Sequence, residues 1–138
     1  MELVALFLWS FLAATIVPLG SEPALAAIVA RGDGLLLPVA IATLGNYLGA
    51  CTTYALAAGV SKRFENRSTT RRTEHAASLV RRYGAPALLL SWVPILGDAI
   101  VAAAGLARMA FVPFSVWTLI GKLARYAALA WIVEWSIR

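Results

Sequence analysis

The chain has 138 residues, of which 61% are hydrophobic and 14% are charged, and its mean hydropathy is +0.78. A soluble domain of this length could not hide so much apolar surface in one core. The composition therefore excludes an ordinary globular protein and predicts one membrane domain, 1–138. The net charge of +5 would suit nucleic acid, but the basic residues gather in one polar segment, so we expect no nucleic-acid partner.

Residues 3–19 form a continuous apolar stretch that predicts a helix, ended by a break at Pro18 and Gly20. A short apolar stretch, 24–30, then leads to the polar turn 31–34. At about 1.5 Å per residue this return covers roughly 10 Å, too little to span a hydrocarbon core of about 30 Å. The two stretches are therefore predicted to form a re-entrant helical hairpin.

Residues 35–60 are long enough to cross the membrane and predict the first transmembrane helix. Gly45 and Gly49 have the spacing of small-xxx-small helix contacts, so this face is predicted to pack against another helix.

The polar segment 61–83 carries most of the positive charge. It holds seven of the twelve basic residues: Lys62, Arg63, Arg67, Arg71, Arg72, Arg81 and Arg82. An excess of Lys and Arg is typical of cytoplasmic loops, so the segment is predicted to be cytoplasmic, with both chain ends on the opposite face. Its residues 73–83 mix apolar and charged side chains at near-helical spacing, which predicts an amphipathic surface helix opening near 68–70.

The second apolar region repeats the plan of the first. Residues 85–96, which include Pro94, are predicted to enter the membrane, to break at Gly97 and Asp98, and to return through 100–106.

Residues 111–137 predict the second crossing helix. Lys122 and Arg125 are unusual in it because they lie well inside the apolar stretch, about one turn apart on one face.

A shift of 76 residues relates the two regions. It overlays Pro18 on Pro94, Glu22 on Asp98 and Gly45 on Gly121. Repeat 1 would cover about 1–60 and repeat 2 about 84–138, each a hairpin followed by one crossing helix. Successive copies would then enter from opposite faces, which is the inverted repeat of secondary transporters. Chance matches in a sequence rich in Ala and Leu are the alternative explanation.

Glu22 and Asp98 are the candidate coupling residues. Intramembrane carboxylates are functional by default, so we interpret them as a proton-titrating or cation-coordinating pair. The alternative is that each stabilises the start of the helix that follows its break.

Lys122 and Arg125 are the candidate counter-charges. They could neutralise the two carboxylates or hold a lipid phosphate. Alternatively, the helix begins later and both side chains reach an interface.

The remaining candidates are structural. The predicted helix-break residues are Pro18, Gly20, Pro94 and Gly97, and the predicted packing glycines are Gly45, Gly49, Gly105 and Gly121. We see no metal-ligand spacing, phosphate-binding loop or nucleophile–base set, so no metal, no cofactor and no enzymatic activity are expected.

With these residues in view, the chain resembles the DedA superfamily, also called SNARE-associated Golgi or VTT proteins, and within it the short YqaA-like branch. The matching residues are Pro18, Glu22, Pro23, Gly45, Gly49, Tyr54, Pro94, Ala104, Gly105, Met109 and Phe114. Ser91 and Gly97 depart from the pattern because typical members carry arginines there, and Ala50 stands where an aspartate is typical. Lys122 and Arg125 are the candidates to supply that positive charge instead.

The resemblance implies two opposed re-entrant hairpins, a role in membrane homeostasis, and the flipping or scrambling of lipids such as undecaprenyl phosphate, often with proton coupling. The sequence thus favours an all-α, multi-pass protein of the cell membrane that acts as a lipid flippase or scramblase. Its expected partners are membrane lipids and protons, and a homo-oligomer is left open. The alternatives are a small-solute or ion transporter and a non-transporting scaffold that acts through the basic loop 61–83.

Overall fold

The computed structural model describes the chain except for residues 16–19, 33, 62–70 and 94. The described part consists of helices and contains no strand, as the sequence predicts. The elements are α1 (Glu2–Ala13), α2 (Glu22–Val29), α3 (Leu36–Ser61), α4 (Arg71–Tyr83), the 3-10 helix η1 (Ala85–Trp92), α5 (Leu96–Leu106) and α6 (Phe111–Ile137).

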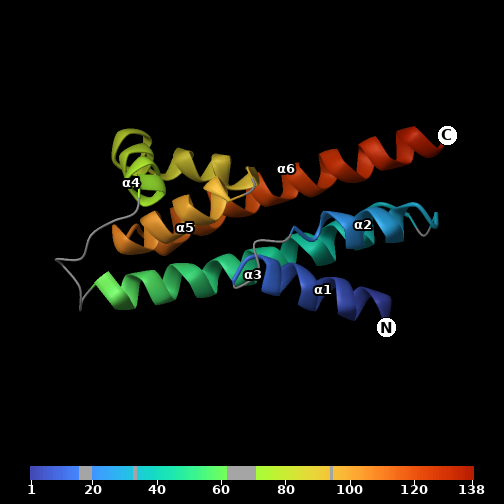
Figure 1. Cartoon of the computed structure of the whole chain (residues 1–138), viewed down its shortest axis with the longest axis horizontal. Helices are drawn as coiled ribbons and strands as arrows, with labels where there is room; N and C mark the ends of the chain where they lie inside the picture. The colour runs from blue at the N-terminus through green and yellow to red at the C-terminus, as the bar shows by residue number, and fades with distance from the viewer. Residues whose placement is uncertain (16–19, 33, 62–70, 94) are drawn as a thin grey trace.

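Two long helices, α3 and α6, run along the whole molecule (Figure 1). They have 26 and 27 residues and are long and apolar enough to cross a membrane. At 1.5 Å per residue each reaches roughly 40 Å, against a hydrocarbon core of about 30 Å. Pro38 and Pro113 each occupy the third position of their helix, where the backbone N–H has no partner within the helix to lose. The prediction of two long apolar helices is confirmed.

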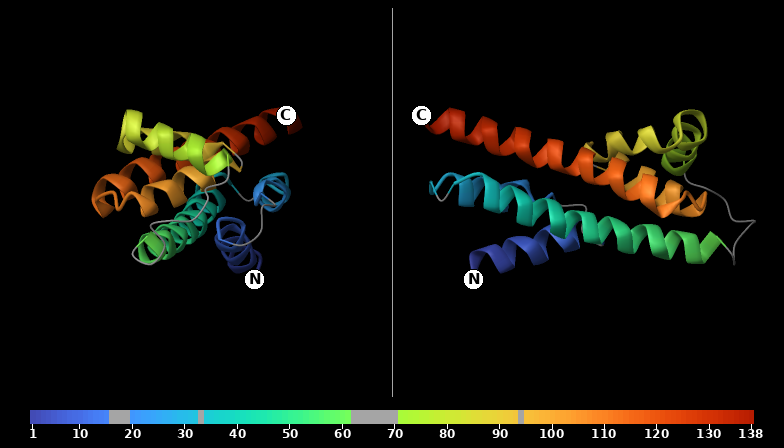
Figure 2. Two further views of the ribbon diagram at one scale, coloured as in Figure 1. Left: turned by 60° about the vertical axis from the view of Figure 1, so that its left-hand side comes forward. Right: turned by 180° about the vertical axis from the view of Figure 1, so that it is seen from behind.

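Two pairs of shorter helices pack on these long helices from opposite ends (Figures 1 and 2). The first pair, α1 and α2, lies at the end that carries both termini, and η1 and α5 lie at the end near α4. The inner ends of both pairs lie near the middle of the long helices, so the two pairs approach one another there.

The first short helix ends earlier than predicted. α1 stops at Ala13 instead of continuing to residue 19, and Ala14 and Thr15 form a turn. The Thr15 hydroxyl donates to the carbonyls of Phe11 and Leu12, so it satisfies backbone groups that would otherwise need the next helical turn. Of the predicted break residues, Gly20 lies between α1 and α2, whereas Pro18 lies outside the described residues.

The second break was predicted at Gly97 and Asp98, and this is wrong by a few residues. Val93 is extended and Ile95 has a left-handed φ of 68°, so α5 begins at Leu96 and both predicted residues lie in its first turn. An extended conformation is favoured for a residue that precedes proline, here the undescribed Pro94. The region before the break also differs, because 85–92 is a 3-10 helix.

Gly97 instead permits a close approach between α5 and η1. A Cβ atom at this position would lie 2.4 Å from the backbone oxygen of Ser91. Gly105 and Gly121 also lie at helix contacts, against Tyr54 of α3 and against Ser91 and the backbone of η1.

Gly45 and Gly49 bring α3 against α1. Cβ atoms at these positions would lie 2.6 Å from the carbonyl oxygen of Phe7 and 2.5 Å from that of Phe11. The small-xxx-small spacing therefore lets two backbones meet directly.

Gly45→Ala is expected to destabilise the protein by about 1–3 kcal/mol, because its methyl group must push the α1 backbone away. Gly59→Ala is the matched control in the same helix, since nothing lies within 4 Å of a Cβ atom there. Unfolding midpoints in detergent micelles measure both variants. Equal midpoints for the two would contradict this account of the α1–α3 contact.

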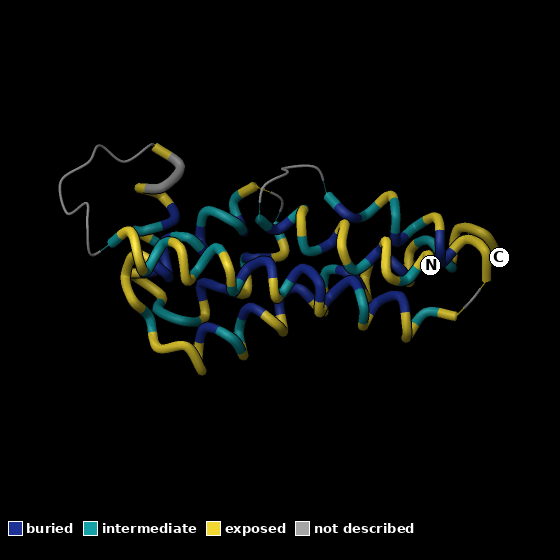
Figure 3. Tube along the Cα trace, turned by 90° about the horizontal axis from the view of Figure 1, so that it is seen from below, coloured by how far each residue is buried: buried dark blue, intermediate teal, exposed yellow. Residues whose placement is uncertain are grey.

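The apolar core is divided into two clusters with polar side chains between them. One cluster joins α4, η1 and α5 to Ala50 and Phe114 of the long helices, and the other joins α1 and α2 to α3 and α6 near the termini. Figure 3 shows buried residues on the facing sides of the helices and exposed ones on the outside. Buried polar side chains are Ser10, Ser21, Thr43, Asn46, Ser91, Thr118 and Lys122.

Five of the eight buried positions of α3 share one register with five of the six buried positions of α6. Pro38, Ala42, Gly45, Asn46 and Ala50 are buried in α3, and Phe114, Thr118, Gly121, Lys122 and Tyr126, each 76 residues later, are buried in α6. The second arms agree in the same way: Leu25, Ile28 and Val29 of α2 correspond to Val101, Ala104 and Gly105 of α5.

The predicted helix at 73–83 is confirmed as α4, which begins at Arg71, while its predicted opening at 68–70 lies outside the described residues. Ala76 and Val80 are buried in the cluster with η1 and α5, whereas Arg81 and Arg82 are exposed. This helix therefore packs on the protein through one face and presents positive charge on the other.

Candidate functional site

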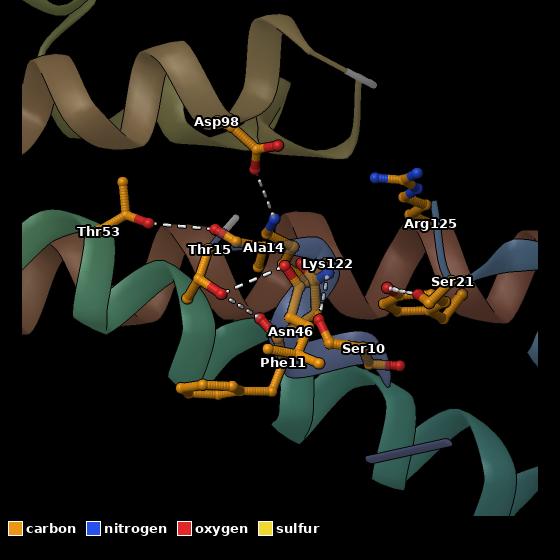
Figure 4. Close-up of polar contacts among 12 residues, drawn as sticks. Ser10, Phe11, Ala14, Thr15, Ser21, Asn46, Thr53, Asp98, Lys122 and Arg125 are labelled. Carbon is orange, nitrogen blue, oxygen red and sulfur yellow. Dashed lines mark hydrogen bonds and ion pairs between the residues drawn. The ribbon is translucent and has the colours of Figure 1, made fainter. Parts of the chain in front are cut away.

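A buried lysine of α6 points toward a carboxylate of α5 (Figure 4). Lys122 projects from α6, and its side chain is 1% exposed. Its Nζ atom lies 3.7 Å from Oδ1 of Asp98, whose side chain is 43% exposed. An ammonium group that has lost its water needs such an opposite charge, because the desolvation cost is several kcal/mol.

A second ion pair lies one turn further along α6. Arg125 pairs with Glu22, the first residue of α2. The neighbouring residues form a parallel contact, in which the hydroxyl oxygens of Ser21 and Tyr126 lie 2.5 Å apart. The start of α2 is thus attached to α6 by two adjacent side-chain pairs.

Glu22 and Asp98 do more than stabilise the starts of their helices. Both lie in the first turn of their helices, where negative charge is favourable, but Ser21 and Ile95 occupy the N-cap positions. Each carboxylate also pairs with a cation of α6. The four charged residues predicted from the sequence are therefore brought together in one place.

A small polar cavity connects the two ion pairs. Its volume is about 30 Å³, and it is lined by Ala13, Gly20, Ser21, Asn46, Ile95, Asp98, Lys122 and Arg125. These residues come from both hairpin turns and both long helices, so this is where the two halves of the chain meet. The space is sufficient for one or two water molecules.

Asn46 is a functional candidate that the sequence analysis did not single out. It is 4% exposed and lines the cavity, and its side-chain nitrogen donates to the backbone oxygen of Ser10 at 3.1 Å. Its side-chain oxygen has no partner among the described residues. The sequence did hold a signal for it, because Asn46 stands 76 residues before Lys122 in a helix without charged residues.

An open apolar groove leads to this centre along α6. It has a volume of about 470 Å³ and is lined by Glu22, Leu89, Trp92, Gly121, Ala124, Arg125, Ala128, Leu129 and Ile132. Glu22 and Arg125 are the charged residues among these, so the groove presents hydrocarbon along its length and one ion pair. A second groove, of about 530 Å³, also reaches Glu22 and is lined by Trp9, Gly20, Glu22, Pro23 and Ala24.

Of the predicted site residues, Pro18 and Pro94 lie outside the described part of the chain. Within that part, no three or more His, Cys, Asp or Glu side chains come together as a metal site would require.

Comparison with known proteins agrees with the sequence resemblance. The profile of the VTT domain matches residues 3–134. An uncharacterised protein of Haemophilus influenzae is 38% identical over 95% of this chain and 87% of its own length. The inner membrane proteins YqaA of Escherichia coli and Shigella flexneri are each 39% identical over 94% of this chain and 89% of theirs. No solved structure matches. The chain therefore belongs to the VTT-domain, or DedA, family of membrane proteins.

Proposed function

We propose that this protein moves lipids across the membrane as a flippase or scramblase, with the two ion pairs as its working centre. The observation that carries the proposal is the groove along α6, whose lining is apolar except for Glu22 and Arg125. A lipid has the same division, since its acyl chains are apolar and its headgroup is charged. The chains could stay in the hydrocarbon while the headgroup passes the polar centre.

The size of the central cavity favours a lipid over a small solute. At about 30 Å³ it holds water but no larger solute, whereas the groove of about 470 Å³ is open at the side. A lipid fits this arrangement because its acyl chains can stay outside the protein while only its headgroup passes the small cavity.

In the proposed topology, α3 and α6 cross the membrane, and the α1–α2 and η1–α5 pairs are re-entrant hairpins from opposite faces. The approach of the two pairs near the middle of the long helices supports this arrangement. The shared register of buried residues at a shift of 76 supports an inverted repeat. The segment 61–83 would be cytoplasmic and both termini would face the other side.

Glu22 and Asp98 are the proposed sites of proton coupling. A proton on either carboxylate would remove its ion pair with α6, and the hairpin turn that carries it would be released from the long helix. The rate of lipid movement is then expected to respond to a pH gradient.

The direct test uses the full chain in liposomes that contain a lipid with a fluorescent NBD group on its acyl chain. Dithionite, which does not cross the membrane, bleaches only the outer leaflet of protein-free liposomes. With the protein present, the remaining inner-leaflet fluorescence is expected to be lost as lipids exchange. Fluorescence that stays at the protein-free level, with and without a pH gradient, would contradict the proposal.

The topology predicts opposite labelling of two single cysteines. In a Cys51→Ala background, a membrane-impermeant thiol reagent outside intact cells should label Ser136→Cys near the C-terminus. It should label Ser78→Cys, an exposed position of α4, only after the cells are opened. Labelling of both cysteines in intact cells would contradict the predicted number of crossings.

A further inference from the structure

The Glu22–Arg125 ion pair lies where two apolar grooves meet. Glu22 lines both grooves, and Arg125 lines the larger one. The side chains of Glu22 and Arg125 are 28% and 15% exposed, so both charges can still be reached from outside. A headgroup at this pair would have two separate apolar grooves next to it.

The residues that line the two grooves have a net charge of zero. Among the described residues that line the two grooves, Arg125 is the one cation and Glu22 the one anion. Lys122 does not line either groove and is held by Asp98 instead. The lipid in these grooves would therefore face one cation and one anion, while Lys122 stays paired with Asp98.

We infer that Glu22 and Arg125 bind the headgroup of a zwitterionic aminophospholipid, with one acyl chain in each groove; the inference rests on the proposed lipid transport and names its lipid class. The guanidinium of Arg125 binds the phosphate through paired N–H donors, and the primary ammonium donates hydrogen bonds to the carboxylate of Glu22. Each protein charge exchanges its partner for one of opposite sign on the lipid, so no charge is left unpaired.

Other common headgroups satisfy this pair less well. The phosphate of phosphatidylglycerol would occupy Arg125 and leave Glu22 unpaired beside a like charge, which is unfavourable. Phosphatidylcholine has both charges, but its quaternary nitrogen has no N–H to donate to the carboxylate. Phosphatidylethanolamine is therefore expected to bind on the order of tenfold more tightly than either of them.

Binding can be measured through Trp9 and Trp92, which line the two grooves. In a full-length variant with Trp117, Trp131 and Trp135 changed to phenylalanine, the remaining fluorescence reports on the grooves. Phosphatidylethanolamine, phosphatidylglycerol or phosphatidylcholine with brominated acyl chains is added at equal low fractions to vesicles of unbrominated phosphatidylcholine. The ethanolamine lipid is expected to quench at about one tenth of the fraction that the other two require.

Matched variants identify the residues that provide the selectivity. Glu22→Gln should remove the preference for phosphatidylethanolamine. Glu2→Gln changes the carboxylate of an exposed ion pair with Arg31, away from both grooves, and should leave the preference unchanged. Equal quenching by the three lipids, or a stronger effect of phosphatidylglycerol, would overturn the inference. The comparison of the three lipids uses a protein in which Glu22 is unchanged. It therefore tests the inference even if Glu22→Gln does not fold.

The same lipids with NBD-labelled chains separate this inference from the proposed function. Selective quenching without lipid exchange would support the headgroup site and overturn lipid transport. Exchange of all three lipids without selective quenching would support transport and overturn the site.

Discussion

Asp98→Asn is expected to destabilise the protein by about 3–5 kcal/mol, and Lys122→Met is expected to cost less. The difference follows from the unequal burial of the two partners. Asp98→Asn leaves the charge of Lys122, whose side chain is 1% exposed, without its carboxylate, whereas Lys122→Met leaves a carboxylate that is 43% exposed. Unfolding midpoints in detergent micelles, followed by tryptophan fluorescence, measure both losses.

The double variant Asp98→Asn/Lys122→Met completes this comparison. A buried ion pair can often be replaced by uncharged groups of similar size with little loss, so the double variant should be more stable than Asp98→Asn alone. Equal losses for the two single variants, or no recovery in the double variant, would mean that the two side chains are not an energetically coupled pair.

Gly97→Ala is the second substitution with a large expected effect. The new methyl group would lie 2.4 Å from the backbone oxygen of Ser91 and 2.8 Å from its carbonyl carbon, so backbone must move. Such overpacking costs about 1–3 kcal/mol, occasionally more. The displacement also falls on Asp98, the next residue, and should weaken its pairing with Lys122. We therefore expect a lower unfolding midpoint together with slower lipid exchange.

The control for this substitution is Ala99→Ser, two residues further along α5, where a partly exposed side chain gains a single oxygen atom. It should leave both the midpoint and the exchange rate close to those of the unchanged protein. Wild-type stability and exchange in Gly97→Ala would mean that α5 and η1 do not need their close approach.

The long helices were predictable because length and continuous hydropathy determine them. The predicted stretches 35–60 and 111–137 agree closely with α3 and α6. The ends of the short helices were not predictable in the same way. α1 ends at Ala13 because the Thr15 hydroxyl satisfies local carbonyls, and α5 begins at Leu96 because the chain is extended at Val93. These are local backbone effects that an apolar pattern does not report.

The charged part of the site was visible in the sequence, because a charge in an apolar stretch is costly and therefore conspicuous. The sequence did not predict which cation pairs with which carboxylate. Either cation could have met either carboxylate, and the structure pairs Lys122 with Asp98 and Arg125 with Glu22. The uncharged partners were missed because a neutral polar side chain in an apolar stretch is less costly than a charge, and their contacts depend on how the helices pack.

Two of the three departures from the family pattern, Ser91 and Gly97, have a packing explanation. Ser91 is 1% exposed, and Gly97 lies so close to its backbone that even a methyl group would not fit without movement. An arginine at Gly97 is therefore incompatible with this packing of η1 and α5. We propose that Lys122 and Arg125 of α6 provide the positive charge at this centre instead.

If the charged centre moves lipid, its effect appears directly as transbilayer exchange of a labelled lipid. Dithionite bleaching of an acyl-labelled lipid is compared in liposomes that contain the unchanged protein, the Asp98→Asn/Lys122→Met variant or no protein. We expect rapid loss of the inner-leaflet signal with the unchanged protein, and a signal at the protein-free level with the folded variant that lacks the Asp98–Lys122 ion pair. Exchange by this variant as fast as by the unchanged protein, or an unchanged protein no faster than empty liposomes, would contradict lipid transport by the charged centre.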